Sequence, residues 1–131
     1  MPDELINRAT VAREQAIAAY SGFKVGSAIE TVDGRIFTGC NIESASFGLT
    51  ACAERVALWK AISEGARQFK RIAVVTGALV PTPPCGACRQ LLWEYCGDIA
   101  VLLHSLNGIE RIFQMAELFP QPFDRHSIQQ E

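Results

Sequence analysis

PCGACR (residues 84–89) and CAER (residues 52–55) are the two stretches that organise this chain of 131 residues. Each stands at the start of a predicted helix. Cys85 and Cys88 are three residues apart, so in the first turn of a helix both sulfur atoms face one side and can reach a single metal ion. Cys52 supplies a third thiolate from the other helix. The partial positive charge at a helix N-terminus favours the ionised sulfur that a metal requires.

The number of ligands indicates what the metal does. Three protein ligands leave one position of a tetrahedral zinc ion open for water, whereas a structural site normally has a fourth cysteine or histidine. We therefore expect one catalytic zinc ion per chain, which would lower the pKa of a bound water molecule towards about 7. Glu54 lies two positions from Cys52, so it points away from the ligand side of the helix. It is predicted to sit beside the water as the general base and then the general acid.

Two arginines each follow a predicted metal-site residue directly. The summed charge of three thiolates exceeds that of Zn²⁺ and weakens it as a Lewis acid. Arg55 and Arg89 are predicted to donate hydrogen bonds to the sulfur atoms and to offset this excess charge.

The rest of the sequence predicts helices and strands in alternation. Asp33-Gly34 and Asn107-Gly108 are hairpin turn signals, and a proline-rich loop delivers Cys85. The predicted helices cover residues 3–19 (capped by Asp3), 50–63 (capped by Thr50), 86–95 and 115–119, and the predicted strands cover 24–31, 35–41, 72–75, 99–104 and 109–113. This order favours an α/β fold, a three-layer α/β/α sandwich around a mixed sheet of about five strands. We expect a single domain over residues 1–131, with a polar tail at 124–131 that frays.

Composition excludes several classes of protein. With 49% hydrophobic and 20% charged residues, the chain has a globular composition and is not predicted to be disordered. Its net charge of -2 leaves no basic face for a nucleic acid. No apolar run reaches the roughly 20 residues that span a membrane, and the acidic N-terminus lacks the pattern of a secretory signal. An odd number of cysteines, five, disfavours a disulfide framework and fits a cytoplasmic location.

Further motifs extend the pattern beyond the metal ligands. YSGFKVG (20–26), GCNIE (39–43) and SEG (63–65) accompany the two cysteine segments in a defined order. Together they resemble the small homotetrameric cytidine deaminases, and the resemblance covers nearly the whole chain. It implies a zinc-dependent hydrolase of pyrimidine salvage that converts cytidine and deoxycytidine to uridine and deoxyuridine and releases ammonia.

The resemblance also implies roles for individual residues. It implies that residues of neighbouring subunits complete each pocket. Phe23 would line the base pocket, Asn41 and Glu43 would bind the ribose, Ala53 would offer backbone contacts to the pyrimidine, and the neighbouring subunits would contribute the stretch from Ala45 to Phe47 and Phe123. Phe47 stands where the family commonly has tyrosine, and Ser44 replaces a frequent asparagine. These departures affect substrate preference and leave the class of reaction unchanged.

Other interpretations of the same residues stay open at this stage. The nearest alternative is a deaminase of the same fold acting on another aminopyrimidine, such as a modified cytidine, a free base or a nucleoside antibiotic. A second is a non-catalytic zinc-stabilised binding module. By residue type alone, Asn41 and Glu43 are more simply solvated loop residues, and Phe123 a core or interface residue. Cys40 and Cys96 are expected to be ordinary buried cysteines.

Overall fold

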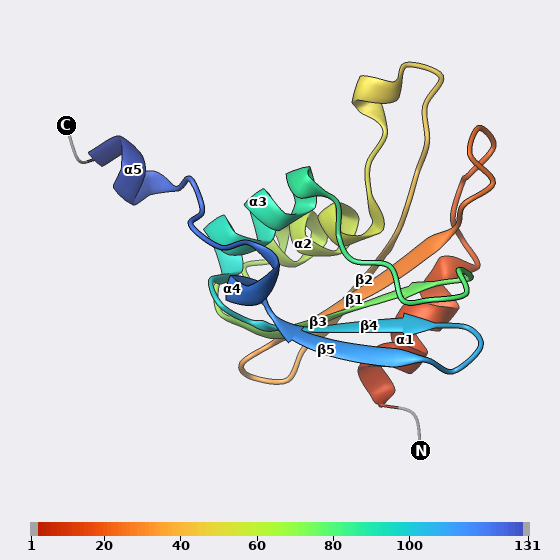
Figure 1. Cartoon of the computed structure of the whole chain (residues 1–131), viewed down its shortest axis with the longest axis horizontal. Coiled ribbons are helices and arrows are strands. Elements are labelled where there is room, and N and C mark those ends of the chain that lie inside the picture. The colour runs from red at the N-terminus through yellow and green to blue at the C-terminus, as the bar shows by residue number, and fades with distance from the viewer. Residues whose placement is uncertain (1–2, 130–131) are drawn as a thin grey trace.

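A five-stranded mixed sheet forms the middle layer of the molecule (Figure 1). The computed structural model describes residues 3–129. The strand order is β2-β1-β3-β4-β5, in which β3 and β4 are parallel and all other neighbours are antiparallel. The strands are β1 (Val25–Thr31), β2 (Ile36–Cys40), β3 (Phe69–Thr76), β4 (Ala100–Ser105) and β5 (Glu110–Gln114). The expected mixed sheet is confirmed, and both predicted hairpins form at their turn signals.

Helices cover both faces of the sheet. The long helices are α1 (Glu4–Arg13), α2 (Ala53–Ser63) and α3 (Gly86–Cys96), and the short ones are η1 (Phe47–Leu49), α4 (Met115–Leu118) and α5 (Arg125–Gln129). In Figure 1, α1 lies on one side of the sheet, and α2 and α3 lie on the other. This arrangement confirms the three-layer sandwich. None of these helices has the length and apolar character that a bilayer-spanning helix needs.

The two faces of the sheet carry cores of different size. Side chains alternate between the faces of a strand, and in β3 Ile72 and Val74 join the larger core under α2 and α3. Ala73 and Val75 face the smaller core beneath α1. The larger core therefore supports the two helices that begin at the cysteine segments.

Two glycines allow helices to lie directly on the sheet. A β-carbon at Gly26 would lie 2.0 Å from the carbonyl oxygen of Ala9 in α1. At Gly39, it would lie 2.5 Å from both the Ala53 oxygen and the Ala57 nitrogen of α2. Backbone atoms cannot withdraw as flexible side chains do. Gly39 thus sets how closely the first turn of α2 approaches the sheet.

The first helix is shorter than predicted. Asp3 caps it as expected, by accepting a hydrogen bond from the Leu5 amide at 2.8 Å. The prediction that it continues to residue 19 is wrong, because it ends at Arg13. The Ile17 amide donates to Asn41 O at 3.0 Å, and Ile17 O accepts from the Glu43 amide at 2.9 Å. This pairing holds residues 14–24 as a loop along the chain that follows β2.

One further expectation needs correction, and the predicted fraying of the tail stays a prediction. The N-cap of α2 is Cys52 and not Thr50, because the Thr50 hydroxyl accepts a hydrogen bond from the Ser44 amide at 3.0 Å. The tail contains the short helix α5, which is preceded by a turn in which Asp124 accepts from the His126 amide at 2.9 Å. Residues 130 and 131 of the predicted tail lie outside the described residues.

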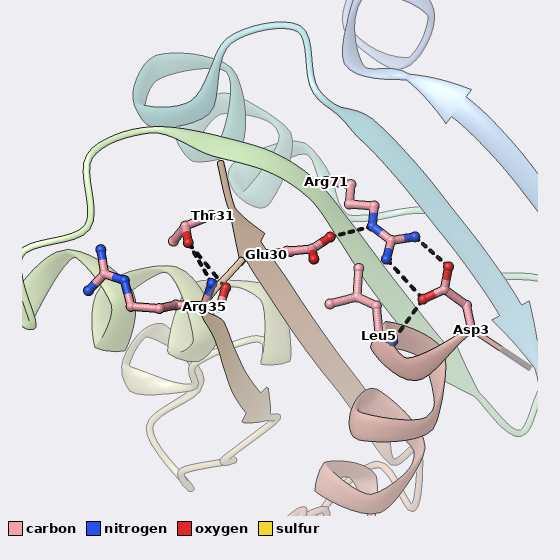
Figure 2. Close-up of polar contacts among 6 residues, drawn as sticks. All are labelled: Asp3, Leu5, Glu30, Thr31, Arg35 and Arg71. Carbon is pink, nitrogen blue, oxygen red and sulfur yellow. Dashed lines mark hydrogen bonds and ion pairs between the residues drawn. The ribbon is translucent and has the colours of Figure 1, made fainter. Parts of the chain in front are cut away.

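A three-residue ionic network joins α1 to the sheet (Figure 2). Arg71 on β3 lies between the Asp3 carboxylate, which it contacts through both terminal nitrogens, and the Glu30 carboxylate on β1, 2.6 Å from its Nε atom. The hydrogen bond from Arg71 is the main cause that lowers the pKa of Asp3 below its ordinary value of 3.8. Asp3 therefore caps α1 and fixes it to the sheet at the same time.

We expect Asp3→Asn to lower the free energy of unfolding by about 1 kcal/mol near pH 7, because asparagine still caps a helix but forms no ion pair. The pKa of Asp3 is lower in the folded state, so this stabilisation is complete well above pH 3.8 and is lost as the pH falls through the folded-state pKa. Urea denaturation between pH 7 and pH 3 measures the difference. Glu4→Gln, which changes an exposed carboxylate of the same helix, is the control. A deficit that stays constant down to pH 3 would contradict the prediction.

Candidate metal centre and active site

The three predicted ligands converge at one point. Cys52 and Cys85 are the N-caps of α2 and α3, and Cys88 lies in the first turn of α3. Their three sulfur atoms lie within 4.8 Å of one another, and those of Cys52 and Cys85 are 3.7 Å apart. Neither N-cap sulfur accepts a hydrogen bond from its own helix. All three sulfur atoms thus remain available to a common ion.

The spacing of the sulfur atoms fits zinc. Bonds of about 2.3 Å in a tetrahedral arrangement place two sulfur ligands about 3.8 Å apart. Thiolates are also the soft ligands that favour zinc over magnesium or calcium. The separation of 3.7 Å between the Cys52 and Cys85 sulfur atoms matches this value, so the three-cysteine site can hold one Zn²⁺ ion.

Hydrogen bonds and charge favour a thiolate at this site. The pKa of Cys52 is lowered to about 6, chiefly by a hydrogen bond from Cys88, with contributions from Cys85 and the nearby charge of Arg55. Sharing that hydrogen bond raises the pKa of the buried Cys88 thiol. The hydrogen bonds within the cluster and the charge of Arg55 therefore favour the ionised form of Cys52.

Glu54 lies in the first turn of α2 and is 5% exposed. Burial raises its pKa to about 7, and the negative charge of Cys52 adds to this shift. A carboxylic acid with a pKa near neutrality can both accept and donate a proton under physiological conditions. Glu54 is therefore suited to proton transfer beside the three cysteines.

A small cavity of about 150 Å³ lies beside Cys52, Glu54 and Cys85. Cavities of about 290 and 330 Å³ lie elsewhere on the molecule, but no metal-site residue lines them. The site cavity is lined by Phe23, Val25, Cys52, Glu54, Val74, Thr76, Thr82, Pro83 and Cys85. It is smaller than the 300 Å³ or more typical of ligand pockets. One chain therefore encloses only part of such a ligand.

Asn41 and Glu43 organise the loop that carries Phe23. Asn41 is 7% exposed, donates to Phe23 O at 2.8 Å and accepts from the Val25 amide at 2.8 Å. One Glu43 oxygen accepts from two successive amides of this loop, at 3.0 Å each. The interpretation as a solvated loop residue is therefore wrong for Asn41, whereas Glu43 does lie in a loop at the surface. The predicted contact of both residues with a ribose stays a prediction.

The remaining predicted site residues are spread more widely. Ala53 is buried in the first turn of α2, directly between two site residues. Ala45 and Phe47 lie on the arm around η1, which projects away from the sheet in Figure 1, and the Phe47 side chain is 72% exposed. Phe123 is also exposed, near α5. None of these last three lines the cavity of its own chain.

The two arginines differ from each other. The Nε atom of Arg55 is buried without a hydrogen-bond partner among residues 3–129, and its charge helps to lower the pKa of Cys52. Arg89 donates to two backbone carbonyls, Pro84 O and Leu118 O, each at 2.8 Å. The structure of the described residues records no hydrogen bond from either arginine to a sulfur atom. That contact stays a prediction.

Two threonines in the cavity wall were missed in the sequence. Thr76 ends β3 and Thr82 lies in the proline-rich loop, and their hydroxyl oxygens are 3.1 Å apart. The available signal was their position, because Thr76 directly precedes the loop that delivers Cys85 and Thr82 lies between two of its prolines. Their bond ties the start of this loop to the end of the central strand.

A cluster of three cysteines beside a buried carboxylic acid with a pKa of about 7 is the arrangement that a zinc enzyme needs. Residues 2–103 match the family described as the cytidine and deoxycytidylate deaminase zinc-binding region. The chain is 50% identical to a cytidine deaminase of Halalkalibacterium halodurans over 91% of both chains, and 44% identical to one of Sporosarcina psychrophila over 96% of this chain and 93% of that one. A crystal structure of the Burkholderia pseudomallei cytidine deaminase superposes with a TM-score of 0.89 at 46% identity, covering 94% of this chain and all of that one. The chain belongs to the cytidine and deoxycytidylate deaminase family.

We expect Cys85→Ser to lose most of its zinc, because a neutral hydroxyl binds the ion far more weakly than a thiolate does. Elemental analysis of the purified variant measures the zinc content per chain. Cys40→Ser is the matched control, because Cys40 lies on β2 outside the sulfur cluster. Full zinc occupancy in Cys85→Ser would remove Cys85 from the ligand set.

Proposed function

We propose that the protein deaminates cytidine and deoxycytidine by hydrolysis at C4 of the pyrimidine, forming uridine or deoxyuridine and ammonia. The observation that carries the proposal is the buried Glu54, whose pKa is raised to about 7, in a cavity that also contains Cys52 and Cys85. A zinc-stabilised binding module has no need for such a group. The names of the relatives described above support this choice of substrate.

Each step of the reaction needs a proton to move. When bound, zinc acts as a Lewis acid that makes a water molecule more acidic. Glu54 accepts the first proton of the water as its oxygen bonds to C4 and delivers this proton to the ring nitrogen. It then accepts the second proton from the new C4 hydroxyl and delivers it to the departing amine. The C4–N bond breaks, a C4 carbonyl forms, and ammonia leaves. Phe23 and Val25 supply the apolar wall against which the flat ring packs.

Glu54→Gln is expected to fold and retain its zinc but to lose at least ~10²-fold in kcat, because an amide accepts no proton from the attacking water. Ammonia release and zinc content are measured on the same preparation. Glu64→Gln, an exposed position at the other end of α2, is the control and keeps full activity. Turnover within a few-fold of the parent would exclude Glu54 from the mechanism.

The site is proposed to require a nucleoside and to discriminate against the free base. Asn41 and Glu43 come from the end of β2, and their bonds to residues 20–25 hold them next to the loop of Phe23. Beyond these bonds Asn41 keeps a second Nδ2 hydrogen, and Glu43 Oε2, which accepts from the Ser21 hydroxyl, keeps a further lone pair. A site that uses such groups to bind a hydroxyl can reject an analogue without it by up to ~10⁴-fold.

We therefore expect kcat/KM for cytidine to exceed that for cytosine by several orders of magnitude. Glu43→Gln keeps an oxygen for the amides of Tyr20 and Ser21 but loses the negative charge, so the ratio falls while the fold is retained. Comparable values for both substrates in the parent would overturn ribose recognition and favour the alternative of a free-base deaminase.

We also propose a cytoplasmic homotetramer in which each active site is completed by neighbouring subunits. The small cavity leaves part of a nucleoside uncovered, while Phe47 and Phe123 are 72% and 62% exposed. All five cysteines are free of disulfides, which fits a reducing compartment.

Light scattering is expected to give a mass four times that of the 14.3 kDa chain. Phe123→Ala is expected to reduce kcat/KM, because a neighbouring site loses an aromatic contact. An active monomer would contradict this proposal.

A further inference from the structure

Side chains of α3 hold the chain that follows β5 against the helix that carries two zinc ligands. The three hydrogen bonds run from Arg89 Nη1 to Leu118 O (2.8 Å), from Gln90 Nε2 to Phe123 O (2.7 Å), and from Trp93 Nε1 to Asp124 Oδ2 (3.1 Å). The C-terminal part of the chain is thus attached along the metal-bearing helix.

Arg89 differs from the other two donors because it makes a second bond, from Nε to Pro84 O at 2.8 Å. Pro84 directly precedes Cys85. One guanidinium group therefore bridges the loop that delivers a zinc ligand and the last residue of α4. A planar guanidinium has donors in a fixed fork and can hold two carbonyls at once, whereas a lysine ammonium is a single point of attachment.

Cys85 is the ligand with the least other support. Cys88 is buried within the first turn of α3. Cys52 follows Ala51, whose backbone pairs with Ile42 in a β-bridge. Cys85 is exposed and follows a loop with three prolines, which have no amide hydrogen to donate. The carbonyl of Pro84 is therefore an important attachment point for this ligand.

The other end of the bridge is firmly held. Met115 at the start of α4 is fully buried, and Leu118 packs against the larger core. A capping box, in which the Gln114 amide donates to Glu117 at 2.8 Å, stabilises the N-terminus of α4. The Leu118 carbonyl lies at the end where a helix leaves carbonyls unpaired, and Arg89 satisfies it.

We propose that Arg89 is a positioning residue for Cys85. By donating to both the Leu118 carbonyl at the end of α4 and the Pro84 carbonyl, Arg89 fixes the residue before Cys85 relative to α4. It acts through the geometry of its two hydrogen bonds and not through its charge. The proposal concerns the three-cysteine site and does not depend on which substrate the enzyme accepts, so the test below uses the metal alone.

Arg89→Lys keeps the positive charge but removes the planar guanidinium group whose two donors bind the Pro84 and Leu118 carbonyls. We expect this variant to release zinc to a chromogenic chelator at least ~10-fold faster than the parent, the range found when groups that orient a ligand are lost. Its cobalt-substituted form should lose part of the thiolate-to-cobalt absorption, because Cys85 is less well placed. Gln90→Ala removes a neighbouring bond of α3 and leaves both bonds of Arg89 in place, so it serves as the matched control. Release and spectrum like those of the parent in Arg89→Lys would overturn the proposal.

A second variant tests the role of α4 at a distance from the metal. Glu117→Ala removes the capping box at an exposed position, and we expect zinc release to become several-fold faster. In the Arg89→Lys background the same change should have no further effect, because the connection is already broken. Equal acceleration in both backgrounds would show another route and overturn the proposal. If Arg89→Lys fails to fold, unchanged zinc release in Glu117→Ala, despite faster amide exchange in α4, would overturn it as well.

Discussion

The need to hold three thiolate sulfurs around one ion governs how this molecule is packed. The ligands Cys52 and Cys85 are 33 residues apart in the chain, and each begins a different helix. Their sulfur atoms meet only because α2 and α3 lie side by side on one face of the sheet with their N-termini at the same end (Figure 1). The absence of a side chain at Gly39 lets the first turn of α2 come close enough to the sheet for this to happen.

The same packing explains the chemistry of Glu54. Its position in the first turn of α2 places it near Cys52 and Cys88, and burial removes it from water. Burial disfavours the charged form of a carboxylic acid, so its pKa rises. The interaction that assembles the metal site therefore also adjusts the acid beside it, without a separate structural element for that purpose.

Local signals made much of the fold predictable. The turns at Gly34 and Gly108 have φ values of 91° and 95°, which glycine adopts readily, so these hairpins follow from a few adjacent residues. The end of α1 was not predictable in this way. Ile17 continues the apolar pattern of a helix, but its backbone pairs with a segment more than 20 residues later. A backbone contact between distant residues produces no periodic pattern of side chains in the sequence.

The site residues also differ in whether adjacent residues or distant contacts determine their positions. The positions of the three cysteines and of Glu54 at the starts of α2 and α3 were predictable, because their spacing follows helical geometry. Their roles stay predictions. The structural bonds of Asn41 and Glu43 reach backbone amides and carbonyls, which any residue type offers, so no pattern marks the partner. The partners of Arg89 were hidden for the same reason. Its position next to Cys88 suggested a bond to sulfur, whereas in the folded chain its guanidinium bridges two carbonyls.

The ion pair between Asp3 and Arg71 has a consequence for how the chain is made. Its two residues are 68 positions apart, and α1 packs on a sheet whose central strand is β3. A helix of ten residues is marginal in water by itself. During synthesis, at about 5–20 residues per second, the apolar side of α1 therefore leaves the ribosome seconds before β3, one of the strands on which it packs. Until β3 has been made, α1 lacks both its ion pair with Arg71 and part of the sheet surface that buries its apolar side chains.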